Sequence, residues 1–316
     1  MITLSEFRKL HHAVTLLGMS GVGKTMLSTA LRQSANWFHY SADYSIGTRY
    51  LVESILDNVK FKIMQMRDPF VANLLRSDSI YINHNISVDN LEPVSTFIGM
   101  YGDPNAGGLD KSSFRERQDL YRRAEVESMK DVSRFISKSW QIYRCKDFVN
   151  DASGSLCEIV DLNDPMDPVI KALTQDSLIL YIEPNPTSED ELKKRARTHP
   201  KPLFYNPDFI TPILTDKPAD GVGIEPLDFA RPLFPDLLEF RKPRYRKIAD
   251  TCGFTIHADE LFQPDEHGNA IPDAARFLDK VHATVIDQAS QSETAADNLQ
   301  RYCAACEGRA ILRNGQ

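Results

Sequence analysis

GMSGVGKT, at residues 18–25, fits the phosphate-loop pattern G-x-x-x-x-G-K-[ST]. The apolar residues 12–17 before it predict a short buried strand, and residues 24–33 after it predict a helix. Strand, glycine-rich turn and helix thus follow one another in the order that this pattern needs to bind phosphate. A turn that binds nothing does not call for Lys and Thr after its last glycine, so we predict a nucleoside triphosphate site here.

The residues of this loop have distinct roles in phosphate binding. Glycines let the backbone bend so that successive amide N–H groups point at the phosphates, and the N-terminus of the following helix adds partial positive charge. Lys24 is expected to reach the β and γ phosphates, and the Thr25 hydroxyl to bind Mg²⁺. The predicted nucleotide-binding residues are Gly18, Ser20, Gly21, Val22, Gly23, Lys24, Thr25 and Met26.

Further apolar runs predict a parallel sheet. The run at residues 177–182 is continuously apolar, as in a parallel strand that is covered on both faces. The predicted strands alternate with helical patterns, which favours an α/β fold of the P-loop NTPase class, with a doubly wound parallel sheet and helices on both faces. Besides residues 12–17 and 177–182, we expect strands at residues 37–41, 147–150 and 254–257.

The pattern divides the chain into a core and two helical parts. We predict a P-loop core at residues 1–50 and 143–271, a helical inserted lobe at 51–142 and a helical C-terminal tail at 272–316. Within the lobe, residues 113–140 are charged on one side and apolar on the other, as in one or two long amphipathic helices. An exposed apolar face on these helices would favour a protein partner.

Composition argues against several classes of protein. The apolar share of 42% in 316 residues is enough for a sizeable core, and a net charge of -7 gives no general attraction to nucleic acid. No apolar run approaches the ~20 residues that span a bilayer, and the first residues do not resemble a signal peptide, so we expect a cytoplasmic protein without a membrane partner. Cys303 and Cys306 lack the second ligand pair of a zinc site.

A phosphate loop alone does not distinguish kinases, ATPases, GTPases and motors. The sequence has no Asn-Lys-x-Asp segment of the kind that reads guanine, and residues 148–151, FVND, lack the Glu that would activate water after Asp151. Asp151 would organise Mg²⁺ at the end of a strand, or else serve as a turn residue or helix cap. Gly154, between two serines, is predicted to present backbone N–H groups to an acceptor or phosphate.

Four segments together carry a resemblance to known proteins. They are the phosphate loop, Asp43 in ADYSIGTRYL, the stretch ILYIEPNPTSEDELKKRARTHPKPLF at residues 179–204, and the Arg-x-Pro-x-Tyr segment that begins at Arg241. With these segments the sequence resembles shikimate kinase and its relatives among the small-molecule and nucleoside-monophosphate kinases. It also looks like a group of bacterial proteins described only as ATPases, which implies no mechanism.

The resemblance implies ATP as the nucleotide and suggests roles for several residues. Asp43 would hold acceptor hydroxyls, and Arg195 or Arg197 of a lid, with Lys201 beside them, would stabilise charge on the transferring phosphoryl group; a solvated helix face is the alternative for that cluster. Arg241 would bind an anionic group of the acceptor, although pairing with a carboxylate explains it equally well.

The sequence departs from this family in ways that affect the acceptor. Gly47 stands where the family has an acidic residue, the three-glycine acceptor motif is missing, and residues 51–142 are far longer than the family's acceptor-binding segment. These departures imply a different, larger acceptor. Arg49 and Arg76 are candidates to contact it, with surface salt bridges as the alternative.

The sequence therefore favours an ATP-dependent kinase that transfers the γ-phosphoryl group to a small, anionic metabolite with the help of Mg²⁺. Its predicted catalytic residues are Lys24, Asp43, Arg195 and Arg197, and its predicted metal ligands are Thr25 and Asp151. Arg49, Arg76, Gly154 and Arg241 join Asp43 as predicted acceptor-binding residues. The alternatives are a regulatory ATPase or nucleotide-dependent switch that acts on a protein partner, and a nucleotide-binding module without chemistry.

Overall fold

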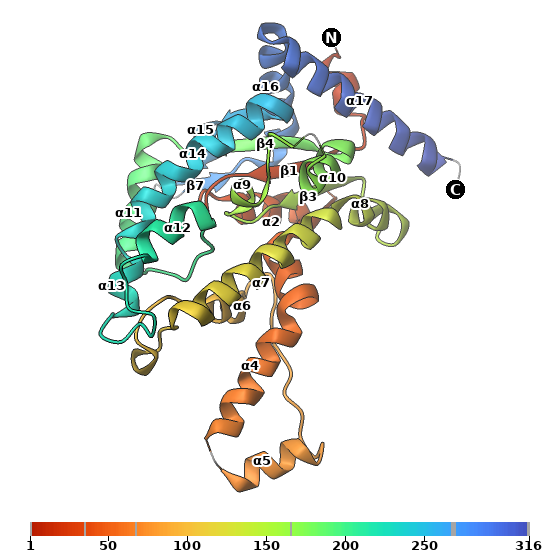
Figure 1. The fold of residues 1–316 in the computed structure, drawn as a ribbon. Helices are drawn as coiled ribbons and strands as arrows, with labels where there is room; N and C mark the ends of the chain where they lie inside the picture. Colours follow the sequence, from red (N-terminus) through yellow and green to blue (C-terminus); the bar gives the residue numbers. More distant parts are fainter. Residues whose placement is uncertain (1, 35, 67, 165, 267–269, 315–316) are drawn as a thin grey trace.

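The sheet of the protein is built from five parallel strands (Figure 1). The computed structural model describes residues 2–34, 36–66, 68–164, 166–266 and 270–314. The strands lie in the order β2-β3-β1-β4-β5, with the phosphate-loop strand in the centre. Their bounds are Ala13–Leu17 for β1, Trp37–Ser41 for β2, Asp147–Asp151 for β3, Leu178–Glu183 for β4 and Phe254–His257 for β5. All five predicted strands are confirmed, each within one residue at either end.

Helices cover both faces of this sheet. Side chains alternate along each strand, so Val14 and Leu16 join one apolar cluster while Ala13 and Leu17 join another. The first cluster includes side chains of α1 (Leu4–Phe7), α2 (Lys24–Ser34), α16 (Phe277–Gln291) and α17 (Glu293–Asn314). The second includes side chains of α7 (Lys111–Lys130), α8 (Val132–Gln141), α9 (Leu156–Ile159), α10 (Pro168–Asp176), α11 (Pro186–Thr198) and α14 (Leu233–Cys252).

Shorter elements connect these helices. The helix α3 (Ala42–Ser45) follows β2 directly and runs into the π-helical turn η1 (Ile46–Leu51). A two-stranded hairpin of β6 (Phe262–Pro264) and β7 (Ala270–Pro272) follows α15 (Ala258–Leu261). The remaining elements are α6 (Glu92–Ile98), α12 (Pro207–Leu214), α13 (Pro226–Ala230) and the 3₁₀ turns η2 (Pro104–Ala106) and η3 (Ala274–Arg276).

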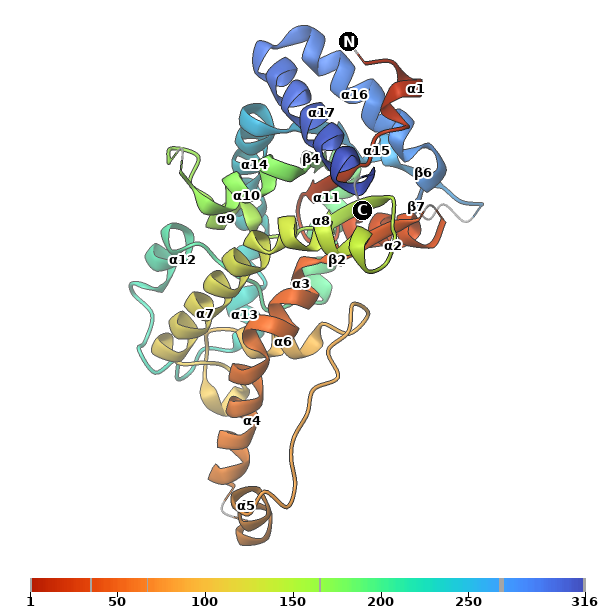
Figure 2. The same cartoon turned by 90° about the vertical axis from the view of Figure 1, so that its right-hand side faces the viewer.

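The inserted residues 51–142 have two different environments. Helices α4 (Val52–Gln65) and α5 (Pro69–Arg76) form an arm that projects away from the sheet (Figures 1 and 2). Helices α7 and α8, in contrast, bury Tyr121, Met129 and Val132 in the cluster that covers one face of the sheet. The predicted inserted lobe therefore shares one hydrophobic core with the sheet in its second part, and the apolar face of residues 113–140 is buried inside the protein.

Helix α14 differs from its prediction. The sequence predicts a helix rich in Arg and Lys that begins near Arg241. The helix instead begins at Leu233 and continues through Pro243. A proline inside a helix costs about 3 kcal/mol, and the buried side chains of Leu237, Leu238 and Ile248 along the same helix offset that cost.

The predicted C-terminal tail packs on the sheet as well. Phe277 and Val281 of α16 and Tyr302 of α17 are buried in the same cluster as Val14 and Leu16 of β1. Residues 272–316 thus share the core of the sheet as far as the structure describes them. Among the described residues, no helix is both long enough and apolar enough to cross a membrane.

Candidate functional site

The phosphate loop connects β1 to α2 and depends on its glycines. Gly18 and Gly23 have φ angles of 143° and 102°, which side chains rarely allow. A Cβ atom on Gly23 would lie 2.5 Å from the ring of Phe262, and one on Gly18 would lie 3.0 Å from the backbone oxygen of Ile182. At these two positions the backbone angle and a close neighbouring segment both favour glycine over any residue with a side chain.

Lys24 lies at the first position of α2 and is buried. Its ammonium donates hydrogen bonds to the backbone oxygens of Gly18, at 2.7 Å, and Met19, at 3.1 Å. Burial lowers the pKa of Lys24, and the charges of Asp151 and Asp43 act in the opposite direction. Two carboxylates thus keep a cation beside the loop, where phosphates would bind.

Asp43 is placed at the carboxyl end of β2 by the short helix α3. Burial raises its pKa to about 6, and the charge of Asp151 adds to this shift, while Lys24 opposes it. The hydroxyl of Tyr121 donates a hydrogen bond to the Asp43 carboxylate at 3.3 Å. A carboxyl group with a pKa near neutrality is suited to accept a proton from an alcohol.

Asp151 ends β3 directly beside Ser41, its register partner on β2. Its carboxylate is 3.5 Å from Nε2 of His39, and both side chains are almost fully buried. Among the described residues, no backbone amide donates to the Asp151 carboxylate, as one would if it capped a helix.

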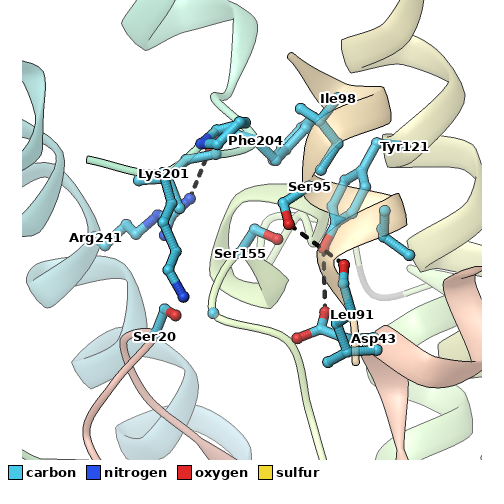
Figure 3. A pocket seen from close by; sticks show the side chains of 14 residues that line it. Ser20, Asp43, Leu91, Ser95, Ile98, Tyr121, Ser155, Lys201, Phe204 and Arg241 are labelled. Carbon is cyan, nitrogen blue, oxygen red and sulfur yellow. Dashed lines mark hydrogen bonds between the residues drawn. The ribbon is translucent and has the colours of Figure 1, made fainter. Parts of the chain in front are cut away.

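A cavity of about 190 Å³ lies between Asp43 and the phosphate loop (Figure 3). Asp43 and Tyr121 line one side, and Lys201 and Arg241 line the other, where Ser20 of the phosphate loop also lies. We refer to it as the acceptor cavity. Its remaining lining residues are Leu91, Val94, Ser95, Ile98, Gly154, Ser155, Pro202, Leu203 and Phe204.

Arg241 forms a buried ion pair within this wall. Its Nε donates to the Glu158 carboxylate, and its Nη2 donates to the backbone oxygen of Phe204 at 2.8 Å. Burial, the largest cause, lowers the pKa of Arg241, but the charges of Glu158, Tyr245 and Cys157 and the hydrogen bond to Glu158 together raise it above its usual value. The carboxylate pairing that the sequence left open is therefore present, and Arg241 also lines the acceptor cavity.

Lys201 is the other cation of the acceptor cavity. Its ammonium points toward Ser20 of the phosphate loop in Figure 3. Among the described residues, no carboxylate forms an ion pair with Lys201 in the acceptor cavity or elsewhere. An anion that entered the cavity would thus meet a positive charge that is not already neutralised.

A second cavity, of about 580 Å³, opens beside the phosphate loop. Gly21, Gly23 and Met26 line it together with Arg195 and Phe262. It is large enough for a nucleoside, and Asp43 does not line it. We refer to it as the nucleoside cavity.

The two predicted lid arginines on α11 are in different environments. Nη2 of Arg195 donates to the backbone oxygen of Gly21 at 3.2 Å, so Arg195 contacts the phosphate loop. Arg197 lines neither the acceptor cavity nor the nucleoside cavity, and its backbone oxygen accepts a hydrogen bond from Arg231. Of the two, Arg195 therefore lies where a nucleotide would bind.

Arg49 and Arg76, predicted to bind the acceptor, do not line the acceptor cavity. Arg49 pairs with Asp131 at 2.8 Å and its guanidinium lies 5.3 Å from the ring centre of Phe135. Arg76 belongs to the projecting arm and donates to Asn73 within its own helix. Arg49 therefore forms the salt bridge that was the alternative explanation, whereas Arg76 forms a local hydrogen bond to an amide oxygen.

Glu125 is a feature that the sequence did not reveal. It lies on α7, is fully buried, and accepts hydrogen bonds from the hydroxyls of Ser153 and Ser155, the latter at 2.9 Å. Burial raises its pKa to about 8. The available signal was a Glu at the position of Tyr121 plus four, on the apolar face of a predicted helix.

Gly154 lies in direct contact with the phosphate loop. A Cβ atom at this position would be 2.7 Å from the backbone nitrogen of Ser20. Gly154 therefore lets the segment after β3 approach the loop closely, and it also lines the acceptor cavity.

Comparisons with known proteins give few matches. No protein-family model matches the sequence, and no curated protein matches it. Among solved structures, the protein is similar to shikimate kinase from Bacteroides thetaiotaomicron, with 14% identity, a TM-score of 0.41, and coverage of 86% of this chain and 97% of that one. It is also similar to a shikimate kinase from Acinetobacter baumannii in complex with shikimate, with 14% identity, a TM-score of 0.34, and coverage of 90% and 98%. Neither likeness carries an activity over to this chain.

Proposed function

We propose that this protein is an ATP-dependent kinase that phosphorylates a hydroxyl group of a small anionic metabolite. The observation that carries this proposal is the acceptor cavity, which is lined by Asp43, Lys201 and Ser20 of the phosphate loop together. A hydrolase needs a positioned water, whereas a pocket with a base at one side and a cation at the other fits an organic acceptor.

In this proposal the nucleoside occupies the nucleoside cavity, and its phosphates follow the loop toward Ser20. Asp43 takes the proton of the acceptor hydroxyl while the oxygen bonds to the γ-phosphorus and the bond to the β-phosphate oxygen breaks. Lys24 turns from the loop oxygens to the phosphates, and Arg195 offsets the charge that develops on the transferring group. Positioning supplies most of the rate acceleration.

Mg²⁺ would be held by Thr25 and Asp151. Thr25 is exposed at the first turn of α2, and Asp151 is a carboxylate at the neighbouring strand end. No cluster of three or more His, Cys, Asp or Glu side chains suited to a metal occurs in the part of the chain that the structure describes. That fits Mg²⁺, which binds nucleotide phosphates with one or two protein ligands and keeps several waters, and which supplies charge neutralisation when bound.

The size and charge of the acceptor cavity indicate the class of acceptor. A volume of about 190 Å³ is below that of pockets for drug-sized ligands, so it favours a small acceptor over the larger one that the inserted segment implied. The Lys201 ammonium favours a carboxylate or phosphate on that acceptor. Arg241, already paired with Glu158, would add a weaker interaction.

The test is transfer of label from γ-labelled ATP, with Mg²⁺, into a pooled small-metabolite extract. We expect one new labelled compound, which disappears with Lys24→Ala and with Asp43→Asn. The matched control is Arg76→Ala on the arm, which should label the same compound at the same rate. Label released only as phosphate, at a rate that Asp43→Asn does not change, would contradict the kinase proposal.

The arm favours a second candidate function, a regulatory ATPase that acts on a protein partner. Four large apolar side chains on the arm and in the segment that follows it are at least 60% exposed, those of Phe61, Met66, Phe70 and Tyr81. Such side chains on a projecting segment are typical of contact sites. This candidate predicts basal hydrolysis that a partner stimulates, no labelled metabolite, and loss of the stimulation in Phe61→Ser/Phe70→Ser.

A further inference from the structure

His39 has two buried ring nitrogens that lack a hydrogen-bond partner among the described residues. Its side chain is 1% exposed, on β2, and neither Nδ1 nor Nε2 makes a hydrogen bond to the described residues. A buried polar group without a partner costs about 1–3 kcal/mol. Trp37, two residues earlier on the same face of β2, is buried in the apolar cluster beneath α2, so a Leu or Val would have fitted at position 39.

The carboxylate of Asp151 lies close to one of these nitrogens. Nε2 of His39 is 3.5 Å from Oδ2 of Asp151, slightly beyond the range of a good hydrogen bond. The strands β2 and β3 pair His39 with Val149 and Ser41 with Asp151, so the two side chains lie diagonally on one face of the sheet. A small rotation of either side chain would bring them into a hydrogen bond.

We propose that His39 is a positioning residue, which donates a hydrogen bond from its ring to Asp151 and so aims that carboxylate at the Mg²⁺ of a bound nucleotide. A carboxylate that binds a metal through one oxygen is generally held by a hydrogen bond to the other, and loss of that partner weakens the metal site. The Asp151 carboxylate accepts no hydrogen bond from another described residue, so the fold offers His39 as the partner that sets its orientation.

This inference rests on the proposed nucleotide site but not on the identity of the acceptor. It can therefore be tested by the binding of a fluorescent ATP analogue, with Mg²⁺ and with excess EDTA. His39→Leu should leave the affinity for the analogue in EDTA unchanged and reduce the gain in affinity that Mg²⁺ gives by about 10-fold. This is the lower end of the loss in metal affinity that follows removal of a hydrogen-bond partner of a metal ligand. His39→Gln, which keeps an N–H donor at similar reach, should restore most of that gain.

Two further variants exclude a general loss of packing. Trp37→Phe alters the same strand and face without contacting Asp151, and it should keep the wild-type gain from Mg²⁺. In an Asp151→Asn background, His39→Leu should have no additional effect, because its only route to the metal has been removed. A His39→Leu protein that keeps the full gain from Mg²⁺, or a wild-type protein that gains nothing from Mg²⁺, would overturn the proposal. Failure to find a labelled metabolite would count against the kinase activity and leave this role of His39 standing.

Discussion

Replacing Asp43 by Asn should make the protein more stable and its phosphoryl transfer much slower. The stability effect follows from the raised pKa of Asp43, from 3.8 to about 6. A carboxyl whose folded-state pKa is raised favours folding fully only below its unfolded-state pKa, and this contribution is lost as the pH rises through the folded-state value. At pH 7 the difference corresponds to about 3 kcal/mol against the folded wild type, at about 1.36 kcal/mol per pKa unit.

Part of this gain will be lost in the variant. The new amide would keep an oxygen that accepts from Tyr121, but the substitution would remove an anion that stabilises Lys24. We therefore expect a net stabilisation of about 1–2 kcal/mol at pH 7, which shrinks toward zero at about pH 4. Urea unfolding at a series of pH values between about 4 and 7 measures this stabilisation directly.

The same variant should lose transfer for a separate reason. General-base catalysis contributes about 10²–10⁴-fold to the rate, so the variant should transfer phosphate that much more slowly at pH 7. The wild-type rate should fall below about pH 6 as Asp43 becomes protonated, and this acid limb should be absent from the variant. A variant that is less stable at pH 7 than at pH 4, relative to wild type, would refute the burial argument, and one with an unchanged rate would refute the role as base.

Three further changes test separate contacts. Glu125→Gln should gain stability over wild type as pH rises from about 4.5 to about 8 and stay level above that, because burial raises the Glu125 pKa to about 8; urea unfolding across this range measures it. Gly154→Ala places a Cβ 2.7 Å from the Ser20 nitrogen, and the roughly 1–3 kcal/mol of overpacking should weaken ATP binding about 5- to 160-fold in a fluorescence titration. Arg195→Ala should slow transfer about 10²-fold while Arg197→Ala stays near wild type in the same labelling assay, since of the two Arg195 contacts the loop; equal effects would contradict this assignment.

The local parts of the fold could be predicted from the sequence because their signals are local. The phosphate loop is set by glycines and by Lys24 within a single short segment, and the buried strands are set by continuous apolar runs. Asp43 and Asp151 could be predicted to meet because the carboxyl ends of parallel strands lie at one edge of a sheet. The structure indeed places both within the electrostatic reach of Lys24.

The partners of other residues could not be predicted, because they come from distant segments. Arg241 pairs with Glu158, which is 83 positions away, and no short motif connects the two. Arg49 is close to Asp43 in sequence, yet its contacts are with Asp131 and Phe135. Proximity in the chain suggested a shared site, whereas the intervening helical turns direct the two side chains to different surroundings.

Two of the buried carboxyl groups carry no free charge at neutral pH, so Asp43 and Asp151 remain to serve the acceptor and the metal in the proposed mechanism. Glu158 is neutralised by Arg241, and Glu125, with a pKa of about 8, is mostly uncharged at neutral pH. Among the described residues, this leaves Asp43 and Asp151 as the carboxylates whose charges act most strongly on Lys24. Asp43 lines the acceptor cavity and Asp151 does not, so in the proposed mechanism the same cation would support one carboxylate that serves the acceptor and one that serves the metal. A nucleotide that withdraws Lys24 to its phosphates would leave Asp43 less stabilised as an anion and hence a stronger base when the acceptor is in place.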